Sequence, residues 1–172
     1  LSDFEVTATS RTYNQSAEGT FGQGLDSVTM DDGLYDGDSV SLQQLRQDDH
    51  FRTNIGVLNM GEEIAEVEIS LFDRLGSEVG AFTLIVGPGL VVQEDHPYFE
   101  DIIAGWAVVT VESGVGVWPY ASVIDGRTGD PTTITARPMP SCPVDIAERL
   151  GDIEGMTVLE QATGNPGYRY FR

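Results

Sequence analysis

The sequence lacks lysine altogether, has one cysteine and two histidines, and has no long apolar run. Its nine basic residues are all arginine, against 28 acidic residues, which gives a formal net charge of −19. Nucleic acid and anionic membranes are bound through basic patches that neutralise phosphate, so we expect neither as a partner. A spanning helix needs about 20 consecutive apolar residues, so no membrane insertion is expected either.

The cysteine and histidine counts limit the chemistry of the chain. Cys142 is alone, so it can be a free thiol or an interchain bridge but cannot form an intrachain disulfide. His50 and His96 lie far apart in the sequence, which disfavours a zinc site. The sequence has no G-x-S-x-G elbow, H-E-x-x-H helix or P-loop. We therefore predict that this chain is not an enzyme, with no catalytic residues and no organic cofactor.

Alternation of apolar and polar residues is the main signal, and it is typical of strands with one buried face. Gly105–Ala136 predicts three strands joined by two turns, and Glu63–Asp73 is the cleanest single strand. Other strands are expected in Leu1–Thr12, Val40–Leu45, Phe51–Met60, Val79–Val86 and Leu90–Glu94. Strand signals at this spacing, with Gly, Pro or Asp between them, favour an all-β, antiparallel β-sandwich.

The remaining segments complete the expected layout. Arg11–Leu25 is polar and rich in glycine and is predicted to be a loop, and Pro97–Ile103 is predicted to be a helical turn. The predicted domains are a β-sandwich at 1–136, a proline-rich linker at 137–143 and a tail at 144–172. The tail is expected to hold a short helix at Val144–Gly151 and a hairpin of Met156–Gln161 and Tyr168–Arg172.

Three aromatic residues are candidates for an interaction surface. Trp106, Trp118 and Tyr120 could form a platform for a sugar or a protein partner. The alternative is that they stabilise the sheets by cross-strand packing. Because Trp118 and Tyr120 share a strand face with Ile124, we expect that face to lie buried against the second sheet.

An acidic stretch between residues 27 and 39 is a candidate calcium loop. Asp31, Asp32, Asp36 and Asp38 offer several carboxylate oxygens on a glycine-containing backbone, as calcium sites require. The spacing is not that of an EF-hand, and a solvated acidic loop is the alternative. Calcium is thus the one cofactor that the sequence leaves possible.

Most of the chain resembles a known kind of domain. The segments FRTNIGVLNMG at Phe51–Gly61, LFDRLGSEVG at Leu71–Gly80 and YASVIDGRTGDPTTI at Tyr120–Ile134 resemble a domain that is common in secreted bacterial proteins. The resemblance covers about residues 1–137 and includes RTYNQSAEGTFGQG at Arg11–Gly24. It implies an immunoglobulin-like sandwich, a secreted or cell-surface location and no catalytic residues. The absence of an initiator methionine at Leu1 suggests a mature or excised form.

The tail carries a second resemblance. VDIAERLGDIEGMTVLEQATGNPGYRYFR, Val144–Arg172, is similar to the N-terminal start of the secreted bacterial tripeptidyl aminopeptidase family of serine peptidases. The catalytic residues of that family would lie downstream of Arg172. The resemblance implies an accessory role for this chain beside such an enzyme.

Three functions from different classes follow. The leading expectation is a non-catalytic extracellular structural or interaction module that binds a protein partner or assembles with itself on the cell surface. The second is the N-terminal accessory region of a secreted serine peptidase. The third is a calcium-dependent adhesion domain.

Overall fold

The computed structural model describes residues 8–17, 19–95 and 101–139. The chain divides into two compact units, residues 1–138, which we call the sandwich unit, and residues 139–172. The tail helix and hairpin predicted beyond residue 143 lie outside the described residues. So do residues 1–7 of the predicted first strand and residues 97–100 of the predicted helical turn.

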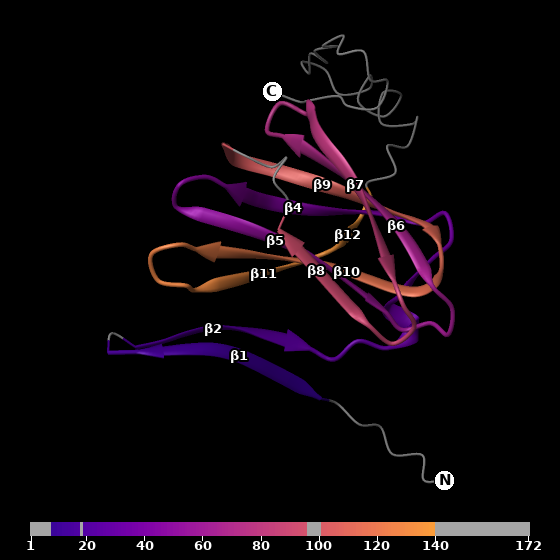
Figure 1. Cartoon of the computed structure of the whole chain (residues 1–172), viewed down its shortest axis with the longest axis horizontal. Coiled ribbons are helices and arrows are strands. Elements are labelled where there is room, and N and C mark those ends of the chain that lie inside the picture. The colour runs from indigo at the N-terminus through magenta and orange to yellow at the C-terminus, as the bar shows by residue number, and fades with distance from the viewer. Residues whose placement is uncertain (1–7, 18, 96–100, 140–172) are drawn as a thin grey trace, which may run out of the picture. The chain divides into compact units, whose positions relative to one another are not determined.

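The strands of the described residues form three antiparallel sheets (Figure 1). Sheet 1 runs β11 (Pro131–Thr135), β10 (Val115–Asp125), β5 (Phe51–Asn59) and β8 (Val91–Asp95), with β3 (Leu34–Tyr35) also paired to β10. Sheet 2 runs β12 (Arg137–Pro138), β4 (Ser39–Gln47), β9 (Ile102–Ser113), β6 (Ala65–Asp73) and β7 (Glu78–Val86). The third sheet is a hairpin of β1 (Thr9–Ser16) and β2 (Gly19–Asp26). This arrangement confirms the predicted all-β, antiparallel, sandwich-like class.

One hydrophobic core joins the two larger sheets. It is built from the alternating residues of each strand, as the sequence predicted for β5, β6 and β9. The fully buried side chains are Leu42, Leu45, Val57, Ala65, Val67, Ile69, Leu71, Val86, Ala107, Val109, Val111, Val117 and Ala121. Because sheet 1 contributes Val57, Val117 and Ala121 and sheet 2 most of the rest, the inner faces of the sheets meet here.

The face of β10 that carries Trp118 and Tyr120 lies on the opposite side of sheet 1 from this core. The prediction that it packs against the second sheet is therefore wrong. In the structure Val117 and Ala121 point toward the second sheet, and the alternation of the strand turns Tyr120 and Ser122 away from it, where both are still buried. Small aliphatic side chains fill the space between the sheets, and the larger aromatic rings lie on the outer surface of sheet 1.

The segment predicted as a loop, Arg11–Leu25, forms the β1–β2 hairpin instead. Its strands pair in register from Thr9 opposite Asp26 to Ser16 opposite Gly19. The hairpin lies beside β11 (Figure 1) and is bonded to sheet 1 by side chains. The Ser122 hydroxyl donates to the Gln23 amide oxygen at 2.9 Å, and the Thr133 hydroxyl donates to the Gly24 carbonyl at 3.3 Å. Because both strands are mostly polar, the sequence of this segment shows little of the apolar alternation that predicts a strand.

Two further boundaries differ from the predictions. Ile102 and Ile103 begin β9, so the end of the predicted helical turn Pro97–Ile103 is strand. Arg137–Pro138 pair with Ser41 and Val40 of β4, so the sandwich extends two residues into the predicted linker. Within the described ranges, no helix has the length and apolar character needed to cross a membrane. The helix that they contain is η1, a 3-10 turn at Met30–Asp32.

Candidate functional site

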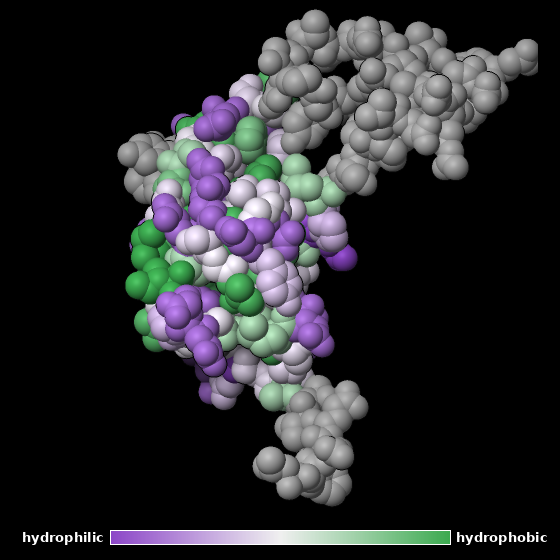
Figure 2. Space-filling model, turned by 90° about the vertical axis from the view of Figure 1, so that its right-hand side faces the viewer, coloured by the Kyte–Doolittle hydropathy of each residue, from purple (hydrophilic) through white to green (hydrophobic). Residues whose placement is uncertain are grey.

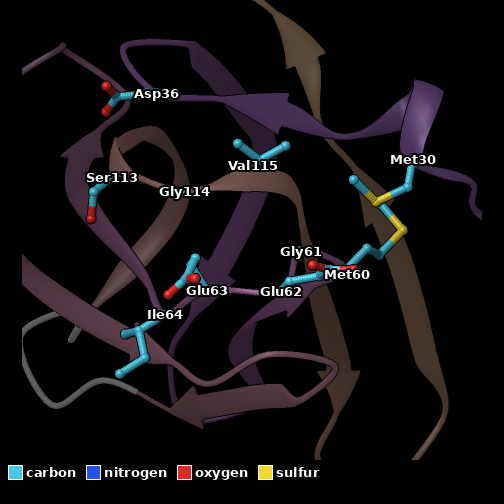
Figure 3. Close-up of a pocket in the computed structure, with 10 residues that line it drawn as sticks. All are labelled: Met30, Asp36, Met60, Gly61, Glu62, Glu63, Ile64, Ser113, Gly114 and Val115. Atoms are coloured by element: carbon cyan, nitrogen blue, oxygen red, sulfur yellow. The ribbon is translucent and has the colours of Figure 1, made fainter.

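A hollow of about 700 Å³ opens at one end of the sandwich unit. We call it the methionine hollow. Its walls come from η1 and the β3–β4 turn, from the β5–β6 loop and from the β9–β10 turn, three regions far apart in the sequence (Figure 3). The lining residues are Met30, Asp36, Met60, Gly61, Glu62, Glu63, Ile64, Ser113, Gly114 and Val115. The hollow is within the size range of about 300–1,000 Å³ that is typical of ligand pockets.

The lining is mainly apolar and is open to solvent. Ile64 is 61% exposed, Val115 48% and Met30 42%, although all three are hydrophobic. Met30 and Met60 extend toward each other across one side of the hollow (Figure 3). Methionine is flexible and polarisable, so such a wall adapts to differently shaped apolar groups.

Asn59 fixes the β5–β6 loop that forms one wall. Its side chain is fully buried, and its amide nitrogen donates to the carbonyl oxygens of Glu63 at 2.7 Å and Val86 at 2.9 Å. Its amide oxygen accepts from the backbone N–H of Gly61 at 2.9 Å. One side chain therefore satisfies three backbone groups and sets the path of the loop.

Close backbone approaches define the floor of the hollow. A Cβ atom at Gly61 would fall on the Val115 carbonyl, and one at Gly116, where φ is +73°, would lie 2.6 Å from the Met30 methyl group. The N–H of Met60 donates to the Gly116 carbonyl at 2.9 Å. The β5–β6 loop and η1 thus pack directly on the start of β10, in contacts that side chains at these glycines would prevent.

The rim of the hollow is acidic. Asp36, Glu62 and Glu63 line it and are all exposed, and no arginine is among its lining residues. Acidic groups beside an exposed apolar surface favour a partner that presents positive charge next to an apolar side chain.

The four aspartates of the predicted calcium loop do not converge on one point. The Asp32 carboxylate accepts from the N–H and the hydroxyl of Thr29, and these bonds hold its pKa below the ordinary value of 3.8. The Asp38 carboxylate accepts from the Tyr35 N–H at 2.8 Å, while Asp36 lines the methionine hollow. Among the described residues, no three His, Cys, Asp or Glu side chains form a group that could hold a metal ion. The calcium site stays a prediction, and the positions of these aspartates do not give it a coordination geometry.

The three candidate aromatic residues divide between the two sheets. Trp118 and Tyr120 stack on the outer face of sheet 1 with ring centroids 5.6 Å apart. Trp106 belongs to sheet 2, where it stacks on Phe72 at 4.3 Å. They therefore do not form a single platform.

Tyr120 is largely buried within its sheet. Its hydroxyl donates to the Gln93 amide oxygen at 2.8 Å, and burial raises the pKa of the phenol above 10.0. Gly56 lies directly beneath the ring, and a Cβ atom at this position would overlap it. These contacts favour the packing interpretation of Tyr120 over an exposed binding role.

His50 lies in a smaller hollow of about 300 Å³ at the other end of the sandwich. The Asp48 carboxylate there forms an ion pair with Arg46 and accepts from the N–H groups of His50 and Phe51. These contacts, the one with Arg46 first, lower the pKa of Asp48 below 3.8. Arg46 also covers the Phe51 ring at 4.0 Å. The aspartate is thus occupied in closing the β4–β5 turn.

Comparison with known proteins gives a fold relationship. No family model matches the sequence, and no curated protein matches it. The crystal structure of Thermotoga maritima 1070 superposes with a TM-score of 0.51 at 9% identity, over 62% of this chain and 97% of that one. At this identity the match is evidence of a shared β fold alone.

The sequence did not reveal the methionine hollow. Its residues come from three regions that only the strand pairing brings together. A usable signal was present in Ile64, an apolar residue directly after Glu62 and Glu63 in a loop.

Proposed function

We propose that the sandwich unit is a non-catalytic, immunoglobulin-like interaction module of a secreted or cell-surface bacterial protein, and that it binds another protein through the methionine hollow. The observation that carries the proposal is the exposure of Met30, Ile64 and Val115 around a cavity of about 700 Å³. Contiguous exposed apolar side chains rimmed by polar ones mark interaction sites on soluble proteins.

The charge of the site supports a protein partner in particular. Asp36, Glu62 and Glu63 surround the apolar lining, and the chain as a whole carries a net charge of −19. An acidic rim repels phosphate and favours arginine or lysine beside an apolar anchor. Figure 2 shows hydrophobic residues set among hydrophilic ones on the face that it presents.

The two other functions remain proposals of lower rank. The accessory role beside a serine peptidase rests on the resemblance of Val144–Arg172, which lies outside the described residues. The calcium-dependent role rests on Asp31, Asp32, Asp36 and Asp38. A site filled to 100 times its dissociation constant would contribute about 2.7 kcal/mol of stability, so a thermal melt with calcium and with chelator tests it.

A photo-crosslinking amino acid at position 64, expressed in the native host, tests the proposed contact. Ile64 lines the hollow, and Glu68, exposed in the middle of β6, supplies the control position. We expect an adduct of discrete mass from position 64 and none from position 68. Equal crosslinking from the two positions, or none from either, would contradict the proposal.

A further inference from the structure

We propose that the occupant of the methionine hollow is the β6–β7 turn, Arg74–Ser77, of a second copy of this chain, so that copies associate head to tail. This inference rests on the proposed function, because it takes the hollow as the contact site. It adds the identity of the partner and the segment that enters the hollow.

The two surfaces lie at opposite ends of the sandwich. In antiparallel strands, successive connections alternate between the ends of a sheet. The hollow uses the β5–β6 loop, so the β6–β7 turn that follows it lies at the other end. The β4–β5 and β10–β11 turns share that other end, because Phe51 pairs with Asp125 there.

Four of the six arginines in the described residues lie in or beside the turns of this other end, and Arg11 and Arg137 lie on β1 and β12. The same turns hold Asp48, Asp49, Asp73, Asp125 and Asp130, so positive charge at that end belongs to single side chains. Arg46 and Arg52 flank the β4–β5 turn, Arg74 lies in the β6–β7 turn and Arg127 in the β10–β11 turn. The hollow end carries Asp36, Glu62 and Glu63 on its rim and no arginine in its lining.

The β6–β7 turn presents an apolar side chain beside a positive one. Leu75 is 69% exposed, and Arg74 next to it is exposed and makes no ion pair within the described part of the chain. This pairing of an apolar anchor with a cation is the chemistry that the apolar floor and acidic rim of the hollow favour. Arg127, by contrast, is followed by Thr128 in its turn and has no large apolar neighbour in sequence.

The turn is held rigid before any contact is made. The Asp73 carboxylate accepts from the N–H groups of Leu75 at 2.8 Å and Ser77 at 2.9 Å. The Asp73 N–H donates to the Ser77 carbonyl at 2.9 Å, and Gly76 takes φ of +83°, which a side chain would disfavour. A preorganised turn loses little conformational entropy on binding, which favours association. Because the Asp73 carboxylate is engaged in these bonds, it does not form an ion pair with Arg74, its neighbour in sequence.

Because each copy carries a net charge of −19, the association of two copies depends on the salt concentration. At long range two copies repel each other. At about 0.15 M salt the Debye length is about 8 Å, so repulsion between distant carboxylates is screened while groups in direct contact still interact. A contact between two different surfaces leaves one hollow and one turn free at the ends of a row of translated copies. It therefore leads to open chains rather than a symmetric dimer.

Sedimentation velocity of end-blocked variants at that ionic strength tests the inference. A turn-blocked variant carries Arg74→Glu and Leu75→Asp, and a hollow-blocked variant carries Ile64→Arg. All three positions are exposed, so the fold should be retained, which circular dichroism would verify. Arg127→Glu is the control for the arginine, since it makes the same charge change as Arg74→Glu in a different turn.

We expect the unmodified protein to form concentration-dependent chains and each blocked variant to sediment as a monomer. An equal mixture of the two blocked variants should give a one-to-one dimer, because one intact turn and one intact hollow remain. The Arg127→Glu control should associate within about threefold of the unmodified protein, against a loss of at least about tenfold for either blocked variant.

Three results would overturn the inference: an unmodified protein that stays monomeric, a mixture that forms no dimer, or an Arg127→Glu variant as impaired as the turn-blocked one. The crosslink from position 64 separates this failure from that of the proposed function. If it captures a different protein while sedimentation shows monomers, the second copy is the wrong occupant and the hollow remains a contact site. If neither experiment gives a product, both proposals fail.

Discussion

Asn59 is the side chain on which the shape of the hollow most depends. Asn59→Ala would leave the Gly61 N–H and the carbonyls of Glu63 and Val86 without their partner. At a net value of about 1 kcal/mol per hydrogen bond, the expected loss of stability is about 3 kcal/mol. Urea unfolding measures it, with Asn14→Ala, exposed on β1, as a control expected within about 0.5 kcal/mol. A loss no larger than that of the control would show that the network contributes little.

Gly56 is required by the ring of Tyr120. Gly56→Ala would place a methyl group on that ring, and the repacking should cost about 1–3 kcal/mol. Gly24→Ala is a suitable control, because its new Cβ would meet nothing closer than the Ser10 carbonyl at 3.8 Å. Chemical denaturation of the two variants compares them. Similar stability in both would mean that Tyr120 can move aside at no cost.

At the scale of elements, aspartates close several of the turns. The Asp125 carboxylate accepts from the backbone N–H groups of Arg127 at 2.7 Å and Thr128 at 3.1 Å. These bonds hold its pKa below the ordinary value of 3.8. A group with a lowered folded pKa stabilises the fold above its unfolded pKa, and this contribution is lost as the pH falls through the folded pKa.

Asp125→Asn removes the charge and keeps the shape of the side chain. We expect the variant to be less stable than the unmodified protein at neutral pH, and the gap to close as the pH falls below 3.8 through the folded pKa of Asp125. Urea unfolding at a series of pH values measures the gap. A gap that stays constant with pH would show that the carboxylate charge does not contribute.

The strands of the core could be predicted from the sequence, because burial repeats every second residue along each of them. In the strand predicted at Glu63–Asp73, the alternate residues Ala65, Val67, Ile69 and Leu71 are all fully buried. The β1–β2 hairpin could not be predicted, because it is polar on most of its surface and its pairing carries little hydrophobic pattern. Which face of β10 meets the core was also predicted wrongly, because large aromatic rings were taken as a stronger sign of the core than small aliphatic ones.

The candidate site was harder to predict than the fold. The aspartates and aromatic residues drew attention by composition, yet the structure engages Asp32 and Asp38 in local hydrogen bonds and divides the aromatic rings between two sheets. The methionine hollow depends on loop packing between segments about 30 to 85 residues apart, a relationship that local periodicity does not encode.

For the molecule as a whole, we expect a bound protein to cover the methionine hollow when the molecule works. Methionine side chains are oxidised readily when solvent reaches them, so Met30 and Met60 serve as built-in probes. Tyr13, 57% exposed on β1 and not part of the hollow, is an internal reference. The most direct measurement is hydroxyl-radical footprinting of the protein in its native setting and of the purified protein in dilute solution.

We expect Met30 to be oxidised at least several-fold more slowly in the native setting while the rate at Tyr13 changes little. Equal rates at Met30 in the two settings, with Tyr13 unchanged, would show that the hollow stays open to solvent and that no protein covers it.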